Sequence, residues 1–156
     1  MATRPSRDQT FMEVARVFAR RSTCRRGQVG AVLVRDRRII ATGYNGAPSG
    51  ARNCLELGCL VPEDNPDLGC QRSIHAEANV IAYTARSQGG AEGTTLYSTA
   101  SPCLKCAQLI AAAGIEKVIY ENPYRITDGL ELLDSLFIPC IQFAWTPIES
   151  DKNDRA

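Results

Sequence analysis

The alternation of strand-like apolar runs with helical segments constrains the fold of this 156-residue chain more than any other feature. Residues 8–21 carry apolar side chains at helical spacing, and Asp8 can cap the start of that helix. Residues 29–34 and 39–44 flank a polar turn, a pattern that predicts a hairpin of two strands. Helical and strand-like segments then alternate, with helices predicted at 75–87, 103–113 and 127–136 and strands at 95–98, 117–120 and 140–145.

This order, αββαβαβαβ, predicts one mixed sheet. A hairpin is antiparallel, whereas strand–helix–strand steps are almost always parallel and right-handed. Alternating elements place helices on both faces of the sheet. We therefore expect an α/β fold, a three-layer αβα sandwich with a five-stranded mixed sheet. The length fits one domain, which we place at residues 1–147, followed by a polar C-terminal tail at residues 148–156.

The composition excludes several classes of protein. Hydrophobic residues make up 44% and charged residues 22%, which is ordinary for a globular domain. No apolar run is long enough to cross a bilayer, and the first ten residues lack the apolar segment of a signal peptide. We therefore expect a cytoplasmic protein. Seven cysteines in such a chain indicate metal ligands more often than disulfides.

Positive charge is concentrated near the N-terminus. The net charge is only +1, yet residues 1–40 hold ten arginines and three acidic residues. This part of the chain is either a solvated, arginine-rich helix and hairpin or a surface that faces a phosphate or a nucleic acid. Residues 45–73 form a long aperiodic loop, and loops of that length are usually functional or held by a staple.

Two short stretches at predicted helix starts carry the chemistry, His75-Ala76-Glu77 and Pro102-Cys103-Leu104-Lys105-Cys106. One imidazole and two thiolates make a three-ligand zinc site whose fourth position stays open for water. Cysteines three apart lie on one helix face, and the helix dipole favours thiolates at an N-terminus. Bound zinc lowers the pKa of its water to about 7. Glu77 is close enough to carry protons without binding the metal.

Each part of this pattern has a simpler explanation when it is taken alone. A Cys-x-x-Cys pair occurs in redox sites and in structural zinc sites, and a lone histidine is usually a packing or surface residue. The combination in this order is much more specific. Because His75 is the only histidine, no Ser–His or Cys–His mechanism has a second candidate.

The order H-x-E followed by P-C-x-x-C is the known signature of zinc-dependent base deaminases. From about Thr10 to Trp145 the chain resembles the cytidine deaminase-like superfamily, and within it the deoxycytidylate (dCMP) deaminase family. The resemblance rests on further stretches, which are Ser22–Arg26, Val29–Val32, Gly43–Gly50 (GYNGAPSG), Cys70–Asn79 and Ser101–Cys106.

The resemblance implies roles for residues outside the zinc motifs. Arg26 would meet the 5′-phosphate, Asn45 would bind the sugar, and Tyr124 would lie near the nucleotide. The backbone of Ala76 and of Ser101 would read the cytosine edge. The alternatives are a surface arginine at Arg26, a turn residue at Asn45 and simple packing at Tyr124.

A second zinc site is expected because some members of the family carry a structural zinc near the long loop. No spare histidine exists, so four cysteines would form it: Cys24, Cys54, Cys59 and Cys70. Three ligands with one bystander, or free thiols, are the alternatives. Cys140 falls in a predicted strand and is interpreted as a small core residue.

The resemblance implies hydrolysis of dCMP to dUMP and ammonia, which would supply dUMP for thymidylate synthesis. The alternative substrates are a 5-substituted dCMP, a nucleoside and tRNA. The non-enzymatic alternative is a zinc-bound interaction module without catalysis. The expected partner is a small nucleotide rather than a nucleic acid or a membrane. Many relatives are homo-oligomers, often hexamers, activated by dCTP and inhibited by dTTP. The effector-binding residues would be Gly43, Tyr44, Asn45, Gly46 and Gly50.

Overall fold

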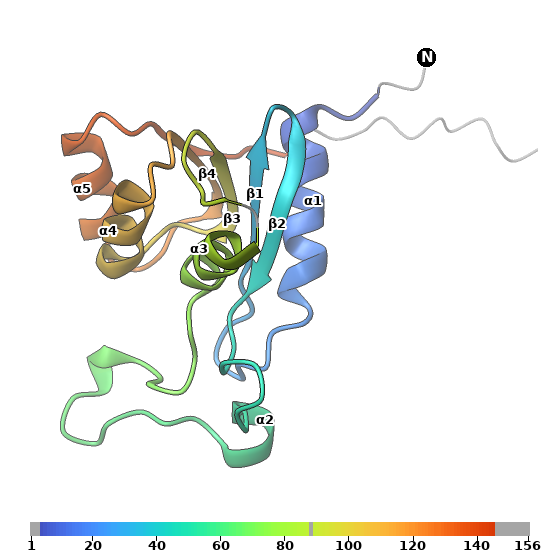
Figure 1. Ribbon diagram of the computed structural model, residues 1–156. Coiled ribbons are helices and arrows are strands. Elements are labelled where there is room, and N and C mark those ends of the chain that lie inside the picture. Colours follow the sequence, from blue (N-terminus) through green and yellow to red (C-terminus); the bar gives the residue numbers. More distant parts are fainter. Residues whose placement is uncertain (1–3, 88, 146–156) are drawn as a thin grey trace, which may run out of the picture.

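Figure 1 shows a computed structural model of the protein, which describes residues 4–87 and 89–145. One five-stranded sheet forms the middle layer, with helix α1 on one face and helices α3, α4 and α5 on the other. This arrangement confirms the predicted three-layer αβα fold. The helices are α1 (Arg7–Ala19), α3 (Ala76–Ser87), α4 (Leu104–Ala112) and α5 (Asp128–Ser135). The strands are β1 (Gly30–Arg35), β2 (Arg38–Tyr44), β3 (Thr95–Ala100), β4 (Lys117–Asn122) and β5 (Cys140–Gln142).

The strands follow the spatial order β2-β1-β3-β4-β5. β1 pairs antiparallel with β2 and with β3, whereas β3 with β4 and β4 with β5 are parallel. The hairpin and the later parallel steps are therefore confirmed. β1 is buried almost throughout because helices cover it on both sides. Ala31 and Leu33 belong to the core under α3 and α4, while Val32 and Val34 pack under α1.

Two details differ from the prediction. Ser6, not Asp8, caps α1, since its hydroxyl accepts a hydrogen bond from the backbone of Gln9. Asp8 instead accepts a hydrogen bond from the hydroxyl of Tyr97, at 2.6 Å, so the carboxylate ties the helix to the sheet. β5 ends at Gln142 rather than at residue 145: the backbone of Phe143 still donates to Tyr120 of β4, and the side chains of Phe143 and Trp145 pack against the cluster under α1.

The long loop also holds short helical segments, α2 (Cys54–Leu57) and the 3-10 helix η1 (Pro66–Leu68). In Figure 1 this region extends from the body of the protein beyond one end of the sheet. Among the described residues, no helix combines the length and the apolar character needed to span a membrane. The expected tail at residues 148–156 lies outside the described residues.

The starts of α3 and α4 are held at the same end of the sheet by close backbone packing. Gly43 in β2 lies against the first turn of α3, where an added Cβ would approach the carbonyl oxygen of Ala76 to 3.0 Å. At Gly129, an added Cβ would lie 2.2 Å from the carbonyl oxygen of Pro102. Because a side chain at either position would collide with backbone, these glycines fix the two segments that carry the predicted zinc ligands.

Candidate active site

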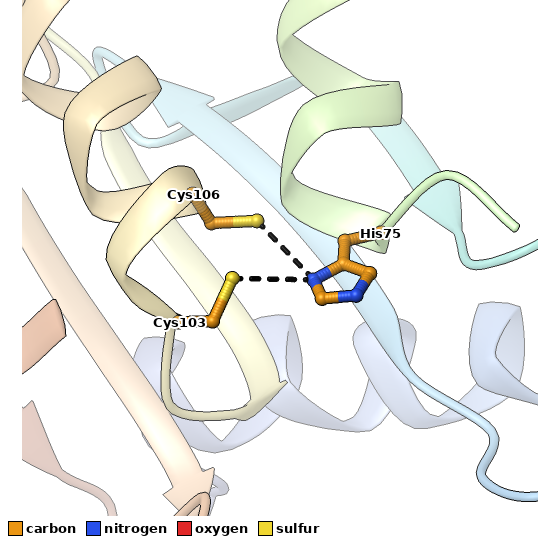
Figure 2. A group of neighbouring side chains, drawn as sticks. All are labelled: His75, Cys103 and Cys106. Carbon is orange, nitrogen blue, oxygen red and sulfur yellow. Dashed lines mark hydrogen bonds between the residues drawn. The ribbon is translucent and has the colours of Figure 1, made fainter. Parts of the chain in front are cut away.

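His75, Cys103 and Cys106 converge from two elements that are distant in sequence. His75 directly precedes α3, Cys103 is the N-cap residue of α4, and Cys106 lies in the first turn of α4. The Nδ1 atom of His75 is 3.5 Å from the sulfur of Cys103 and 3.5 Å from the sulfur of Cys106 (Figure 2). Over residues 4–87 and 89–145, this is the one group that gathers three such ligand atoms within 4.8 Å.

These separations fit a tetrahedral zinc ion. Zinc binds histidine nitrogen at about 2.0–2.1 Å and cysteine sulfur at about 2.3 Å. A tetrahedron with those arms has nitrogen–sulfur edges of about 3.5 Å, which equals both observed distances. Two sulfurs and one nitrogen also match the ligand preference of zinc and leave a fourth position open, as catalytic zinc sites do. The donor set therefore fits the metal.

The protonation of the two thiols supports the same assignment. A hydrogen bond with Cys106, and then the contact with His75, lower the pKa of Cys103 to about 4 against the opposing effect of burial. The hydrogen bond with Cys103, together with burial, raises the pKa of Cys106. Zinc binds cysteine as the thiolate, so binding of the ion would release the protons of these thiols.

Glu77 lies beside the trio in the first turn of α3, and only 3% of its surface is exposed. Burial raises the pKa of its carboxyl to about 7, while its own backbone and the nearby His75 act in the opposite direction. A carboxyl with a pKa near neutrality can both accept and donate a proton at working pH. The site therefore contains a buried acid–base group next to three metal-ligand atoms.

A cavity of about 330 Å³ opens onto this group, a volume within the usual range for small-molecule sites. It is lined by His75, Glu77 and Cys103 and by all five residues predicted to contact substrate, namely Arg26, Asn45, Ala76, Ser101 and Tyr124. Segments separated by up to about a hundred residues thus form one site. The role of each lining residue remains a prediction.

Hydrogen bonds within the protein limit what two of these residues can offer a ligand. The side-chain amide of Asn45 accepts from the backbone of Val29 at 2.8 Å and donates to the carbonyl of Gly27 at 2.9 Å. One amide hydrogen and one lone pair of Asn45 are left. The backbone N–H of Ser101 donates to Asn122, and its hydroxyl accepts from the backbone of Tyr124. Ser101 therefore offers its carbonyl oxygen.

The structure adds Arg125 to the cavity, a residue that the sequence analysis did not single out. Its guanidinium lies 3.8 Å from the carboxylate of Asp67 and 5.9 Å from the ring centroid of Tyr124. Asp67 belongs to η1, so this ion pair joins the long loop to the segment after β4. No motif marks Arg125, because its place in the cavity depends on how two separate loops fold.

The four remaining predicted zinc ligands lie near one another but less compactly. The sulfurs of Cys54 and Cys70 are 3.6 Å apart, close to the edge of about 3.8 Å in a zinc–thiolate tetrahedron. Burial tends to raise the pKa of the Cys70 thiol. Backbone hydrogen bonds from Leu60 and Arg72 outweigh this effect and lower that pKa to about 7. In the described chain, no three sulfurs of the set Cys24, Cys54, Cys59 and Cys70 lie within 4.8 Å of one another.

The predicted effector residues do not share one surface. Gly43 is buried against α3, and Gly46 is also buried, where an added Cβ would approach the hydroxyl of Thr23 to 2.9 Å. Gly50 is exposed and has a φ of 84°, a left-handed backbone angle that favours glycine. Packing or backbone geometry therefore accounts for these three glycines without a ligand.

Comparison with known proteins agrees with this site. Residues 5–122 match the family model of the cytidine and deoxycytidylate deaminase zinc-binding region. A deoxycytidylate deaminase of Mycobacterium phage D29 is 44% identical over 125 residues, which cover 76% of this chain and 96% of the relative. The deoxycytidylate deaminase of Schizosaccharomyces pombe is 43% identical over 129 residues, but the match covers only 39% of its length.

A solved structure is similar over almost its whole length. The dCMP deaminase of the cyanophage S-TIM5, crystallised in complex with dCMP and dUMP, superposes with a TM-score of 0.78 and 37% identity. The match covers 90% of this chain and 99% of that protein. The chain therefore belongs to the cytidine and deoxycytidylate deaminase zinc-binding family.

Proposed function

We propose that this protein is a zinc-dependent enzyme that hydrolyses dCMP to dUMP and ammonia, and so supplies dUMP for thymidylate synthesis. One observation carries the proposal: the His75–Cys103–Cys106 trio lies beside the buried carboxyl of Glu77 in a cavity of nucleotide size. The deaminase domain would comprise residues 1–147. The S-TIM5 neighbour, which was solved with dCMP and dUMP, supports the choice of substrate.

The residues of the site suit each step of the reaction. Zinc held by the trio would supply a water of lowered pKa, about 7, as the nucleophile. The carboxylate of Glu77 takes the proton from the attacking water and delivers it to ring nitrogen N3 of the cytosine. Glu77 then carries the second proton to the departing amino group, which leaves C4 as ammonia. The oxygen of water replaces the amino nitrogen at C4, so that dCMP and water give dUMP and ammonia.

Recognition would divide among the lining residues. The backbone N–H of Ala76 can donate to the cytosine O2, and the carbonyl of Ser101 can accept from the exocyclic amine. Asn45 would use its remaining amide hydrogen for the sugar, with Tyr124 beside the nucleotide. Arg26 would bind the 5′-phosphate, since a guanidinium fork matches two phosphate oxygens.

The test is an assay of ammonia release with dCMP, dCTP, deoxycytidine, 5-methyl-dCMP and tRNA, with metal analysis of the same sample. We expect dCMP to be the best substrate and zinc to be the bound metal. Better turnover of 5-methyl-dCMP would assign a modified nucleotide instead. Turnover of tRNA or deoxycytidine above that of dCMP would contradict the proposed phosphate contact, and a lack of activity would indicate a non-catalytic zinc module.

A second, structural zinc bound by Cys24, Cys54, Cys59 and Cys70 is part of the proposal. Support comes from the short contact between Cys54 and Cys70 and from the low pKa of Cys70, about 7. The loop that holds three of these cysteines buries few large side chains, and a closed four-ligand ion would stabilise it.

All seven cysteines are free thiols in the structure. That state suits the reducing cytoplasm, where we place the enzyme.

The last part of the proposal concerns regulation by nucleotides and assembly into an oligomer. A homo-oligomer, with a hexamer as the expected form, would bind dCTP as activator and dTTP as inhibitor along the Gly43–Gly50 loop. This segment contains Asn45, which lines the active-site cavity, so one segment would contact both ligands. Saturation curves for dCMP with and without each triphosphate, alongside the mass in solution, test this. Hyperbolic curves that neither triphosphate moves would refute it.

A further inference from the structure

Asn79 joins the two parts of the candidate site that a nucleotide would bridge. Its side-chain amide donates a hydrogen bond to the carbonyl of Tyr44, at 2.8 Å, and Tyr44 directly precedes Asn45 in the chain. Its backbone N–H donates to the carbonyl of His75, at 2.9 Å, just before α3. One residue therefore contacts both the segment of the proposed sugar-binding residue and the helix start that carries His75 and Glu77.

Neither the helix nor the proposed reaction explains an asparagine at this position. Asn79 lies inside α3, and asparagine is among the weaker helix formers because its amide competes with backbone groups. It is half-buried, and it belongs neither to the lining of the active-site cavity nor to the proposed metal site. Its amide bonds to another element rather than to its own helix, which indicates a role in joining the two.

The carbonyl of Tyr44 depends on this donor. β2 is an edge strand, so it has a neighbouring strand on one side only. Gly30 is the residue of β1 that pairs with Tyr44, but its N–H donates to the hydroxyl of Thr99 on β3, at 3.1 Å. Asn79 therefore takes the place that a further strand, or Gly30 itself, would fill at this carbonyl.

The same contact fixes the direction of the Asn45 side chain. The carbonyl of Tyr44 and the N–H of Asn45 belong to one planar peptide group, and this N–H donates to Val29 at 3.1 Å. α3 thus holds one end of the group and the sheet holds the other. Beyond it, the carbonyl of Asn45 accepts from the hydroxyl of Ser22, while the Asn45 side chain takes its place opposite Val29. The free amide hydrogen of Asn45 therefore points where the preceding peptide group directs it.

A second connection between the two segments consists of backbone alone. The N–H of Gly46 donates to Ile74 at 3.1 Å, and the N–H of Ile74 donates to Gly46 at 2.9 Å. This bridge joins the residue after Asn45 to the residue before His75. Because no side chain takes part, the bridge persists when Asn79 is replaced, and we expect such variants to fold.

We propose that Asn79 is a positioning residue that holds Asn45 at the distance from the zinc site that a deoxynucleotide requires. This inference rests on the proposed function. The deoxyribose of dCMP has one free hydroxyl, at C3′, so a hydrogen bond from Asn45 to a sugar hydroxyl must be made there. The cytosine C4 must reach Glu77 and the metal-ligand trio while that hydroxyl reaches Asn45. A misplacement of about 1 Å can cost about 100-fold in rate.

The test compares dCMP with 2′,3′-dideoxycytidine monophosphate, which lacks the sugar hydroxyl, as substrates of the zinc-loaded enzyme. Asn79→Leu keeps a branched side chain without the amide, and Asn79→Ala provides a second variant with the best helix former. We expect the wild type to prefer dCMP by about tenfold in kcat/KM, the worth of one hydrogen bond. Both variants should lose most of this preference through slower turnover of dCMP, with little change for the dideoxy substrate.

The matched control, Thr84→Val, removes a hydrogen bond of α3 away from the loop. The hydroxyl of Thr84 is buried and donates to the carbonyl of Val80, at 2.6 Å. This variant should keep the wild-type preference for dCMP, even where its Tm differs from that of the wild type. Tm and zinc content are measured for every variant.

An equal loss of turnover for both substrates in the Asn79 variants would overturn the inference, because it would show only a weakened α3. Loss of zinc from these variants, or an unchanged preference for dCMP, would overturn it as well. A wild type that turns over both substrates equally would have no sugar contact to position, so the inference would fail while the deaminase proposal stands. Absence of dCMP turnover in the wild type would overturn both.

Discussion

Replacement of Glu77 by glutamine tests the proposed mechanism most directly. Glutamine fills the same buried space beside the trio but cannot accept a proton. Loss of one positioned acid–base group costs about 100- to 10,000-fold in rate, or about 2.7–5.4 kcal/mol of transition-state stabilisation. Because Glu77 serves more than one proton transfer, we expect a loss in kcat near the upper end. KM for dCMP should change little, since recognition is assigned to other residues.

The stability of this variant provides an internal check. The pKa of Glu77, raised to about 7 by burial, shows that its ionised form is costly in the folded protein. A neutral amide avoids that cost, so Glu77→Gln should unfold at or above the temperature of the wild type. Zinc content should also be retained, because Glu77 is not one of the three proposed ligands.

The assay is steady-state release of ammonia from dCMP, with zinc content and Tm measured on the same preparation. Glu116→Gln, at an exposed position before β4, is the matched control and should keep full activity. A kcat for Glu77→Gln within about tenfold of the wild type would refute the assignment of Glu77 as the proton carrier. Loss of activity together with loss of zinc would also contradict it, since the residue would then act through the metal site.

Three further changes test other parts of the structure. Cys54→Ser should lower zinc content from about two ions per chain to about one, measured by atomic emission, and should lower Tm while dCMP turnover persists; a single ion in the wild type would exclude the second site. Arg26→Ala should narrow the preference for dCMP over deoxycytidine by about 1.5–3 kcal/mol in kcat/KM, and an unchanged ratio would remove the phosphate contact. Gly30→Ala should strongly destabilise the fold in thermal unfolding, because an added Cβ would lie 1.9 Å from the carbonyl oxygen of Ala15; a Tm equal to that of the wild type would contradict the close packing of α1 on β1.

The layers of the fold could be predicted because local pattern and tertiary structure agree in most elements. β1 reads as a continuous apolar run because helices cover both faces of the sheet there, and β4 reads as a strand for the same reason. The predicted N-cap of α1, Asp8, was wrong because Ser6 and Asp8 are both good capping residues. Only the tertiary contact with Tyr97 assigns Asp8 to another task.

The candidate site divides in the same way. His75, Cys103 and Cys106 could be found from spacing, because each motif lies at a helix start and the family signature connects them. The place of Arg125 in the cavity could not be found from spacing, because it depends on the contact with Asp67 across two loops. Spacing also could not predict that the side-chain amide of Asn45 and the backbone N–H of Ser101 already form hydrogen bonds with backbone groups.

The antiparallel pairing of β1 with β3 has a consequence for the order of folding. Hairpin β1–β2 and the β3–β5 unit each form through contacts between neighbours in sequence, whereas the pair Ala31–Ser98 must close a long stretch of chain. Closing such a loop costs several kcal/mol of chain entropy, which local contacts do not repay. His75 lies within that stretch, and its two sulfur partners belong to the second unit. We therefore expect enzymatic activity to return late in refolding, after most helical signal has been regained.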